Sequence, residues 1–133
     1  MLNRDRLQGI LLSSARPELT IYRNEKKNLG YEVRTRVFFR ADNQQFLWAI
    51  QEGLALLHIT ATFRERESKV RPKPVLWVSG ISNLVALCGL VPIEEPDAKN
   101  TWSSFRQAID IIYQGEHNTQ EGLDVLLIIK GLI

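Results

Sequence analysis

The sequence contains a single cysteine, Cys88, and no apolar run that approaches the roughly 18 residues of a membrane span. One cysteine excludes an internal disulfide, and its apolar neighbours predict a buried thiol in a reducing compartment. The opening residues 1–6 lack the continuous apolar segment and cleavage site of a secretory signal. We therefore expect no membrane partner and a cytoplasmic protein of a prokaryote, while an organelle would leave the same features.

The sequence is also poor in the motifs of common catalytic sites. It has no glycine-rich phosphate loop and no nucleophile elbow. His58 and His117, the two histidines, have no cysteine, histidine or acidic partner at metal-ligand spacing. We expect no metal from these residues, and we expect His117 to form a hydrogen bond at a helix start.

Composition and the distribution of charge indicate the size of the domain and a candidate binding surface. With 133 residues and 44% apolar content, the chain suits one compact domain over residues 1–133, without repeats or linkers. The net charge is only +2, yet residues 20–73 hold eleven Lys/Arg against six Asp/Glu. This segregation indicates a candidate surface for a polyanion, although an ordinary solvated sheet surface has the same composition.

Periodicity predicts an α+β fold with the order helix, hairpin, helix, hairpin, helices. Asp5 is a candidate cap for the first helix, and Pro17 is expected to end that segment. The further expected elements are strands 19–23 and 30–40, a helix capped by Asn43, strands 59–67 and 75–78, a helix over 82–90, an acidic connector over 92–97, and two helices that start near Trp102 and at Asn118 or Thr119. Asn118 with Glu121 resembles a capping box.

The second strand alternates between an apolar and an arginine-rich face. Val33, Thr35, Val37 and Phe39 are expected on the first face, and Arg34, Arg36, Phe38 and Arg40 on the second. Arg64 and Arg66 are expected to share one face of the third strand. The tryptophans Trp48, Trp77 and Trp102 fit core positions, whereas Tyr22 and Phe38 are the aromatics that could face a ligand.

Several short sequence motifs occur along the chain in an order that is typical of one protein family. Leu7-Gln8-Gly9-Ile10-Leu11-Leu12-Ser13-Ser14-Ala15 opens the chain, Leu29-Gly30-Tyr31-Glu32-Val33 precedes Phe38-Phe39, and Gly89-Leu90-Val91-Pro92 precedes Lys99, Trp102 and Phe105. The most specific string is Gly115-Glu116-His117-Asn118-Thr119-Gln120-Glu121-Gly122-Leu123, followed by Ile128-Ile129-Lys130. From Arg4 to Lys130 the chain resembles the LAGLIDADG homing endonucleases of the single-motif, homodimeric type, with a degenerate first helix.

The resemblance implies an αββαββα domain with a saddle-shaped antiparallel sheet and additional C-terminal helices. It implies a homodimer on double-stranded DNA with a palindromic or near-palindromic site. The implied subunit contact involves Leu7, Gly9, Ile10 and Ser13. The implied DNA-binding residues are Arg34, Arg36, Arg40, Arg64 and Arg66 in the groove, and Arg23, Lys26, Lys27, Lys69, Arg71 and Lys73 at the hairpin tips near phosphates.

The same resemblance places doubt on cleavage. Family endonucleases hold Mg²⁺ through an acid at the end of each motif helix, and here that position is Ser14, while the earlier acidic slot is Leu12. Glu18 is the nearest acid that could replace it, and Lys99 matches a basic residue of the family. We expect a sequence-specific DNA-binding protein without a cofactor that has lost cleavage. The alternatives are an active Mg²⁺-dependent endonuclease, an RNA-binding maturase, and an interaction module that binds no nucleic acid.

Overall fold

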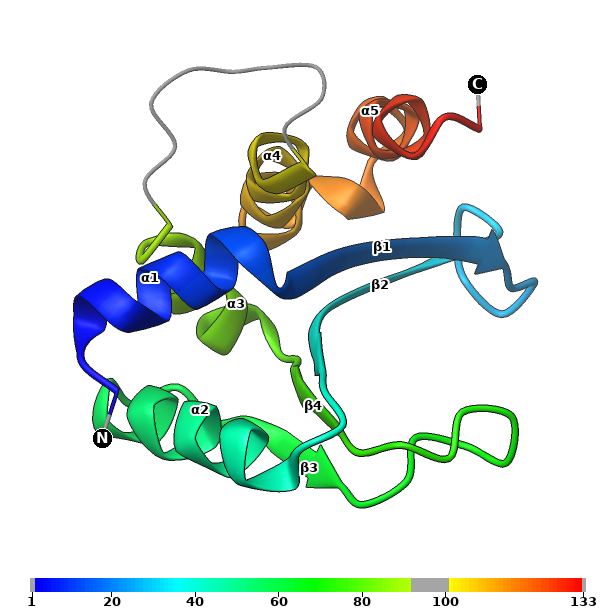
Figure 1. Cartoon of the computed structure of the whole chain (residues 1–133). Coiled ribbons are helices and arrows are strands. Elements are labelled where there is room, and N and C mark those ends of the chain that lie inside the picture. The colour runs from blue at the N-terminus through cyan, green and yellow to red at the C-terminus, as the bar shows by residue number, and fades with distance from the viewer. Residues whose placement is uncertain (1, 92–100, 133) are drawn as a thin grey trace. The chain divides into compact units, whose positions relative to one another are not determined.

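The computed structural model describes residues 2–91 and 101–132 and has the predicted α+β architecture (Figure 1). The acidic connector and Lys99 lie outside the described residues. The strands form one antiparallel sheet in the order β1-β2-β4-β3. No helix in the described part of the chain is long and apolar enough to cross a membrane. The elements are α1 Arg4–Ser13, β1 Ala15–Arg23, β2 Tyr31–Arg40, α2 Gln44–Leu56, β3 Thr62–Arg64, β4 Val75–Val78, α3 Ile81–Cys88, α4 Thr101–Tyr113, the 3-10 helix η1 Glu116–Asn118 and α5 Gln120–Lys130.

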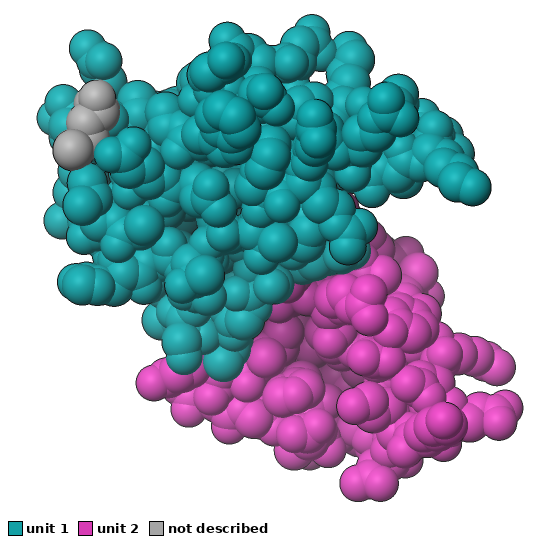
Figure 2. Space-filling view, turned by 90° about the horizontal axis from the view of Figure 1, so that it is seen from below, with its two compact units in different colours: residues 1–16, 36–92 teal, residues 17–35, 93–133 magenta. Residues whose placement is uncertain are grey.

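The chain divides into two compact units (Figure 2). Unit 1 comprises residues 1–16 and 36–92, and unit 2 comprises residues 17–35 and 93–133. Strands β1 and β2 contribute residues to both units: β1 crosses the boundary after Arg16, and β2 crosses it before Arg36. The expectation of one domain over the whole chain stays a prediction.

The core of unit 1 lies between helices and one face of the sheet. In the register of β2 with β4, Val37 pairs with Val78 and Phe39 with Leu76, and all four side chains are buried. Helix α2 contacts β3 and β4, and α1 packs on α2. A side chain at Gly53 of α2 would lie 3.3 Å from Leu7 of α1, so a small residue permits the close approach of these two helices. Cys88 is buried, as predicted.

The core of unit 2 is formed by the parts of β1 and β2 that belong to this unit and by the C-terminal helices. Leu19 of β1 packs with Ala108 of α4 and Leu126 of α5, and Ile21 and Val33 lie against this cluster. Trp102 and Phe105 of α4 are buried and meet edge to face, with their centroids 6.0 Å apart. Trp102 therefore occupies the core position that was predicted for it from the sequence.

Helix and strand ends differ from several predictions. Asn43 caps α2 as predicted, but Asn3 caps α1, with its side chain accepting from the amide of Arg6, and Asp5 lies in the first turn. Thr119 caps α5, so the Asn118 capping box is wrong. Pro17 lies inside β1, where it is tolerated because β1 is an edge strand.

The third strand is much shorter than predicted. Only Thr62–Arg64 pairs with β4, so Arg66 lies beyond the strand end. Ile59 and Ala61 are buried, but they precede the strand. Helix α3 starts at Ile81 and ends at Cys88, one to two residues before its predicted bounds. Alternation of apolar residues indicates burial here, whereas hydrogen bonding to β4 decides where the strand ends.

Candidate nucleic-acid interface

The sheet of unit 1 carries an arginine face opposite its apolar face. Antiparallel pairing places Phe38 directly across from Trp77, Arg40 across from Val75, and Arg64 across from Val75 on the other side of β4. Residues two apart in a strand point to the same side, so Arg36 joins them. We call Arg36, Arg40 and Arg64, with Phe38 and Trp77 beneath them, the arginine face.

Aromatic rings support these guanidinium groups. Arg36 and Arg40 lie 4.8 and 4.5 Å from the centroid of Phe38, and Arg64 lies 5.5 Å from that of Trp77. All three distances from a guanidinium to a ring are within the roughly 6 Å range of cation–π attraction. The centroids of the two rings are 6.5 Å apart. The sequence correctly predicts the face of Phe38, but the residue is only 6% exposed, so its contact with a ligand stays a prediction.

The loop between β3 and β4 brings charged residues to the edge of this face. The backbone amide of Glu67 donates to the carbonyl of Lys73, and the amide of Ser68 donates to that of Arg71, which leaves Lys69 and Val70 at the tip. Glu67 accepts two hydrogen bonds from Arg40, of 2.7 and 2.9 Å, and lies 3.8 Å from Arg71. Lys73 pairs with Asp42 at 2.7 Å. A mainly apolar hollow of about 380 Å³ lies between Arg40 and the segment from Val70 to Pro74.

Unit 2 carries a second polar network on the β1–β2 hairpin. Arg34 donates to the hydroxyl of Tyr22 at 3.2 Å, and its guanidinium lies 5.7 Å from the ring centroid. A hydrogen bond between Tyr22 and Glu32 raises the pKa of the Tyr22 hydroxyl. The same bond, together with one from Asn24, lowers the pKa of Glu32. Tyr22 is exposed, as predicted, so it and Arg34 are available to a ligand.

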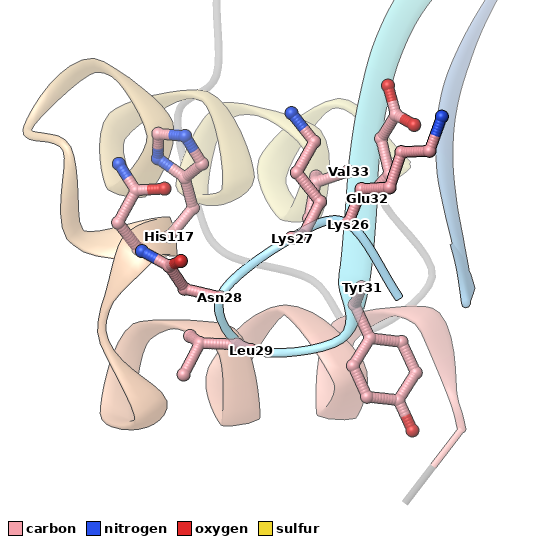
Figure 3. Close-up of a pocket in the computed structure, with 9 residues that line it drawn as sticks. Lys26, Lys27, Asn28, Leu29, Tyr31, Glu32, Val33 and His117 are labelled. Atoms are coloured by element: carbon pink, nitrogen blue, oxygen red, sulfur yellow. The ribbon is translucent and has the colours of Figure 1, made fainter. Parts of the chain in front are cut away.

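The hairpin tip borders a cavity of about 270 Å³ within unit 2 (Figure 3). Lys26, Lys27 and Glu32 come from the hairpin, and His117 comes from η1. The His117 Nδ1 is buried without a hydrogen-bond partner, so the predicted hydrogen bond at a helix start is not formed by this nitrogen. Burial, with a smaller contribution from Lys27, lowers the pKa of His117 below its ordinary value of 6.5, which favours the neutral imidazole.

The helix that resembles the family motif presents a partly small, partly apolar surface. Gly9 and Ser13 are exposed one turn apart, and Leu12 beside them is 54% exposed. Leu7, in contrast, is 2% exposed and packs inside unit 1, and its part in a subunit contact stays a prediction. Ile10 is partly buried.

The position at which the resemblance predicts an acid carries a neutral group. Ser14 caps the C-terminus of α1, and its Oγ lies 3.2 Å from the Oγ of Ser13. Two hydroxyl groups do not supply the anionic oxygen that Mg²⁺ requires, so these residues do not fit the metal. Glu18 belongs to unit 2 and accepts a hydrogen bond of 3.3 Å from Thr20. Within residues 2–91 and 101–132, no three His, Cys, Asp or Glu side chains gather as metal ligands.

Three features of the surface were not predicted from the sequence. Trp48 is 44% exposed and packs edge to face on Phe63, with centroids 5.6 Å apart, so its predicted core position is wrong. Trp77 is only partly buried, because it lies on the arginine face. The pairing of Glu67 with Arg40 joins residues 27 positions apart, and no spacing rule predicts it.

No protein-family model matches the sequence, and no curated protein matches it. Solved structures do match. The homing endonuclease I-TnaI superposes with a TM-score of 0.78 at 21% identity over 97% of this chain and 85% of its own. The archaeal intron-encoded homing endonuclease I-Vdi141I, complexed with DNA, gives 0.78 at 19% identity over 95% and 78%.

The LAGLIDADG meganuclease I-CpaMI, bound to uncleaved DNA, gives a TM-score of 0.78 at 20% identity, with 98% of this chain and 43% of that chain covered. The chain thus spans most of I-TnaI and I-Vdi141I but less than half of I-CpaMI. The chain has the fold of the LAGLIDADG homing endonucleases.

Proposed function

We propose that residues 1–133 act as one domain that binds double-stranded DNA as a homodimer, recognises a palindromic or near-palindromic site, and no longer cleaves it. The arginine face carries this proposal: three guanidinium groups are held side by side over Phe38 and Trp77. An arginine pairs through two hydrogen bonds with the major-groove edge of guanine. An array of arginines on a sheet therefore has the chemistry to read base pairs.

The hairpin tips add the contacts that position DNA. Lys26 and Lys27 are exposed at one tip, and Lys69 with Arg71 is exposed at the other. Flexible cations at such places suit phosphates, which fix the orientation of a duplex without reading its sequence. Solved proteins with this fold, I-CpaMI and I-Vdi141I, have been determined with DNA.

The homodimer is proposed to form through α1. Gly9 and Ser13 would allow a second α1 to approach closely, and Leu12 would bury its exposed apolar surface there. Such a contact between identical surfaces has two-fold symmetry, and two-fold protein symmetry corresponds to a palindromic site.

Loss of cleavage is proposed from the chemistry of Ser14. In a two-fold dimer each copy would contribute the same residue to a shared site, and a hydroxyl at that position brings no negative charge. The function retained would be recognition, as in a regulator.

Selection of bound duplexes from a random pool, with recovered DNA checked for Mg²⁺-dependent cutting, tests the whole proposal. We expect an enriched palindrome that stays uncut. Enrichment with cutting would establish an active endonuclease, and Glu18→Gln would then test the replacement acid. No enrichment from duplex pools, but binding from an RNA pool, would move the function to RNA.

A paired substitution tests the surface. Arg36→Ala with Arg64→Ala should weaken binding to the selected duplex by roughly a hundredfold, since each base contact is worth about 1–3 kcal/mol. It should also reduce the slope of affinity against salt. Arg106→Ala, at an exposed position on α4, is the matched control and should leave both unchanged. Unchanged affinity of the double variant would contradict the arginine face as the binding surface.

A further inference from the structure

Glu67 is a carboxylate at the edge of the proposed DNA-binding surface, where it would repel phosphates. Its Oε1 accepts from Arg40 Nε at 2.7 Å and its Oε2 from Arg40 Nη2 at 2.9 Å. Arg71 Nη1 lies 3.8 Å from Oε2. The side chain is 21% exposed, so this is a partly sheltered pair with two parallel hydrogen bonds.

Arg40 is held from two directions. Its guanidinium carbon lies 4.5 Å from the centroid of the Phe38 ring, which restrains the group on that side by cation–π attraction. The hydrogen bonds to Glu67 restrain its rotation, and Nε and Nη2 donate them. Glu67 is itself fixed, because its backbone amide is bonded to the carbonyl of Lys73 across the loop.

We propose that Glu67 is a positioning residue that sets sequence specificity: it orients Arg40 so that the Nη1–Nη2 edge meets a guanine in the duplex. This inference rests on the proposed DNA-binding function. A guanidinium oriented before binding loses less side-chain freedom when it pairs with a base. A misplaced guanidinium could still attract phosphates, but it would discriminate poorly among base pairs.

The chain offers a matched control in Asp42. This residue also pairs with a cation near the same loop, Lys73, at 2.7 Å. The pair is open to solvent, because the Asp42 side chain is 82% exposed and that of Lys73 is 71% exposed. The ammonium group of Lys73, unlike a guanidinium, is not planar and has no edge of two donors that a partner could orient. Neutralising Asp42 therefore changes the charge of the surface in the same way without affecting the orientation of Arg40.

The experiment measures the affinity of Glu67→Asp, Glu67→Gln and Asp42→Asn for the selected duplex, its single base-pair variants and an unrelated duplex. Glu67→Asp keeps the charge but shortens the side chain, so discrimination at one base pair of each half-site should fall about tenfold, with affinity for the unrelated duplex unchanged. Glu67→Gln should lose the same discrimination and bind every duplex more tightly. Asp42→Asn should bind every duplex more tightly and keep full discrimination.

The outcomes separate this inference from the proposed function. A wild-type protein without preference among duplexes overturns the proposed function. Wild-type discrimination that persists in Glu67→Asp overturns only the role of Glu67, and a Glu67→Gln profile identical to Asp42→Asn reduces Glu67 to a surface charge. The Arg40 Nε–H resonance reports the pair without DNA: slow hydrogen exchange in the wild type and fast exchange in Glu67→Asp is expected. Thermal unfolding of each variant confirms that it is folded.

Discussion

A glycine at position 122 allows the chain before α5 to pass directly against that helix. Gly122 is buried, and a Cβ placed on it would overlap the backbone of Glu116. Thr119 connects the two segments by hydrogen bonds: its hydroxyl donates to the Glu116 carbonyl at 2.7 Å and accepts from the Gly122 amide at 3.1 Å. The most specific string in the sequence therefore has a structural reason.

Replacing Gly122 by alanine should lower the free energy of unfolding by about 2–3 kcal/mol, because the clash is with backbone that cannot turn aside. Chemical denaturation measures this change. Gln107→Ala is the control, since Gln107 is exposed on α4 outside the proposed interface, and it should be neutral or raise stability slightly. Similar losses in both variants would contradict the explanation.

Glu67 also links stability to pH. Its hydrogen bonds with Arg40 hold its pKa below the ordinary value of 4.5. Since the folded state then binds fewer protons than the unfolded state, the stabilisation is present above pH 4.5 and is lost as pH falls through the lowered pKa. The difference in melting temperature between wild type and Glu67→Gln should shrink over that acid range.

Glu65→Gln, two residues away at an exposed position, is the charge control and should show no such convergence. A constant difference between wild type and Glu67→Gln down to the acid limit of folding would count against the link.

At the scale of elements, α2 ends in a turn that would favour glycine but contains histidine. His58 has a φ of 62°, and the amides of His58 and Ile59 donate to the carbonyls of Ala55 and Leu54. This is the hydrogen-bond pattern of a Schellman motif, whose left-handed position is usually glycine. The His58 side chain is exposed at this turn.

His58→Gly should therefore raise the free energy of unfolding by about 0.5–1 kcal/mol, since relief of left-handed strain exceeds the added freedom of the unfolded chain. Ala55→Gly, in the last turns of the same helix, should lower it by roughly 1 kcal/mol. Thermal denaturation of the two variants checks the opposite signs. A loss of stability in His58→Gly would mean that the imidazole makes a favourable contact.

Elements with uninterrupted periodicity were predictable from the sequence. The buried side of α4, the cap of α2 and the alternation in β2 all follow from residue spacing. The length of the short strand β3 could not be predicted from residue spacing, because it depends on where the pairing with β4 stops. Local pattern identifies a strand, but the partner determines its ends.

At the scale of the whole molecule, the proposed homodimer is the feature with the clearest test. Leu12 is exposed on α1, so Leu12→Glu should not disturb the fold of one chain. It would place like charges opposite each other across a two-fold contact. In sedimentation we expect a dimer for the wild type at micromolar concentration and a monomer for Leu12→Glu.

Leu56→Glu is the matched control, because Leu56 is 56% exposed on α2 and lies outside the proposed contact. This variant should stay dimeric. A Leu12→Glu protein that remains dimeric, or a wild type that is monomeric, would remove α1 as the interface and with it the argument for a palindromic site.

The sequence by itself determined the α+β class, the order of elements, the resemblance to LAGLIDADG homing endonucleases and the arginine-rich side of β2, because these depend on local spacing. Tertiary structure decided that Phe38 is covered by Arg36 and Arg40, that Trp48 is exposed, and that Glu67 binds Arg40. Strand period gives the side to which a residue points. Only strand register and loop geometry, which join residues far apart in the chain, decide what covers it there.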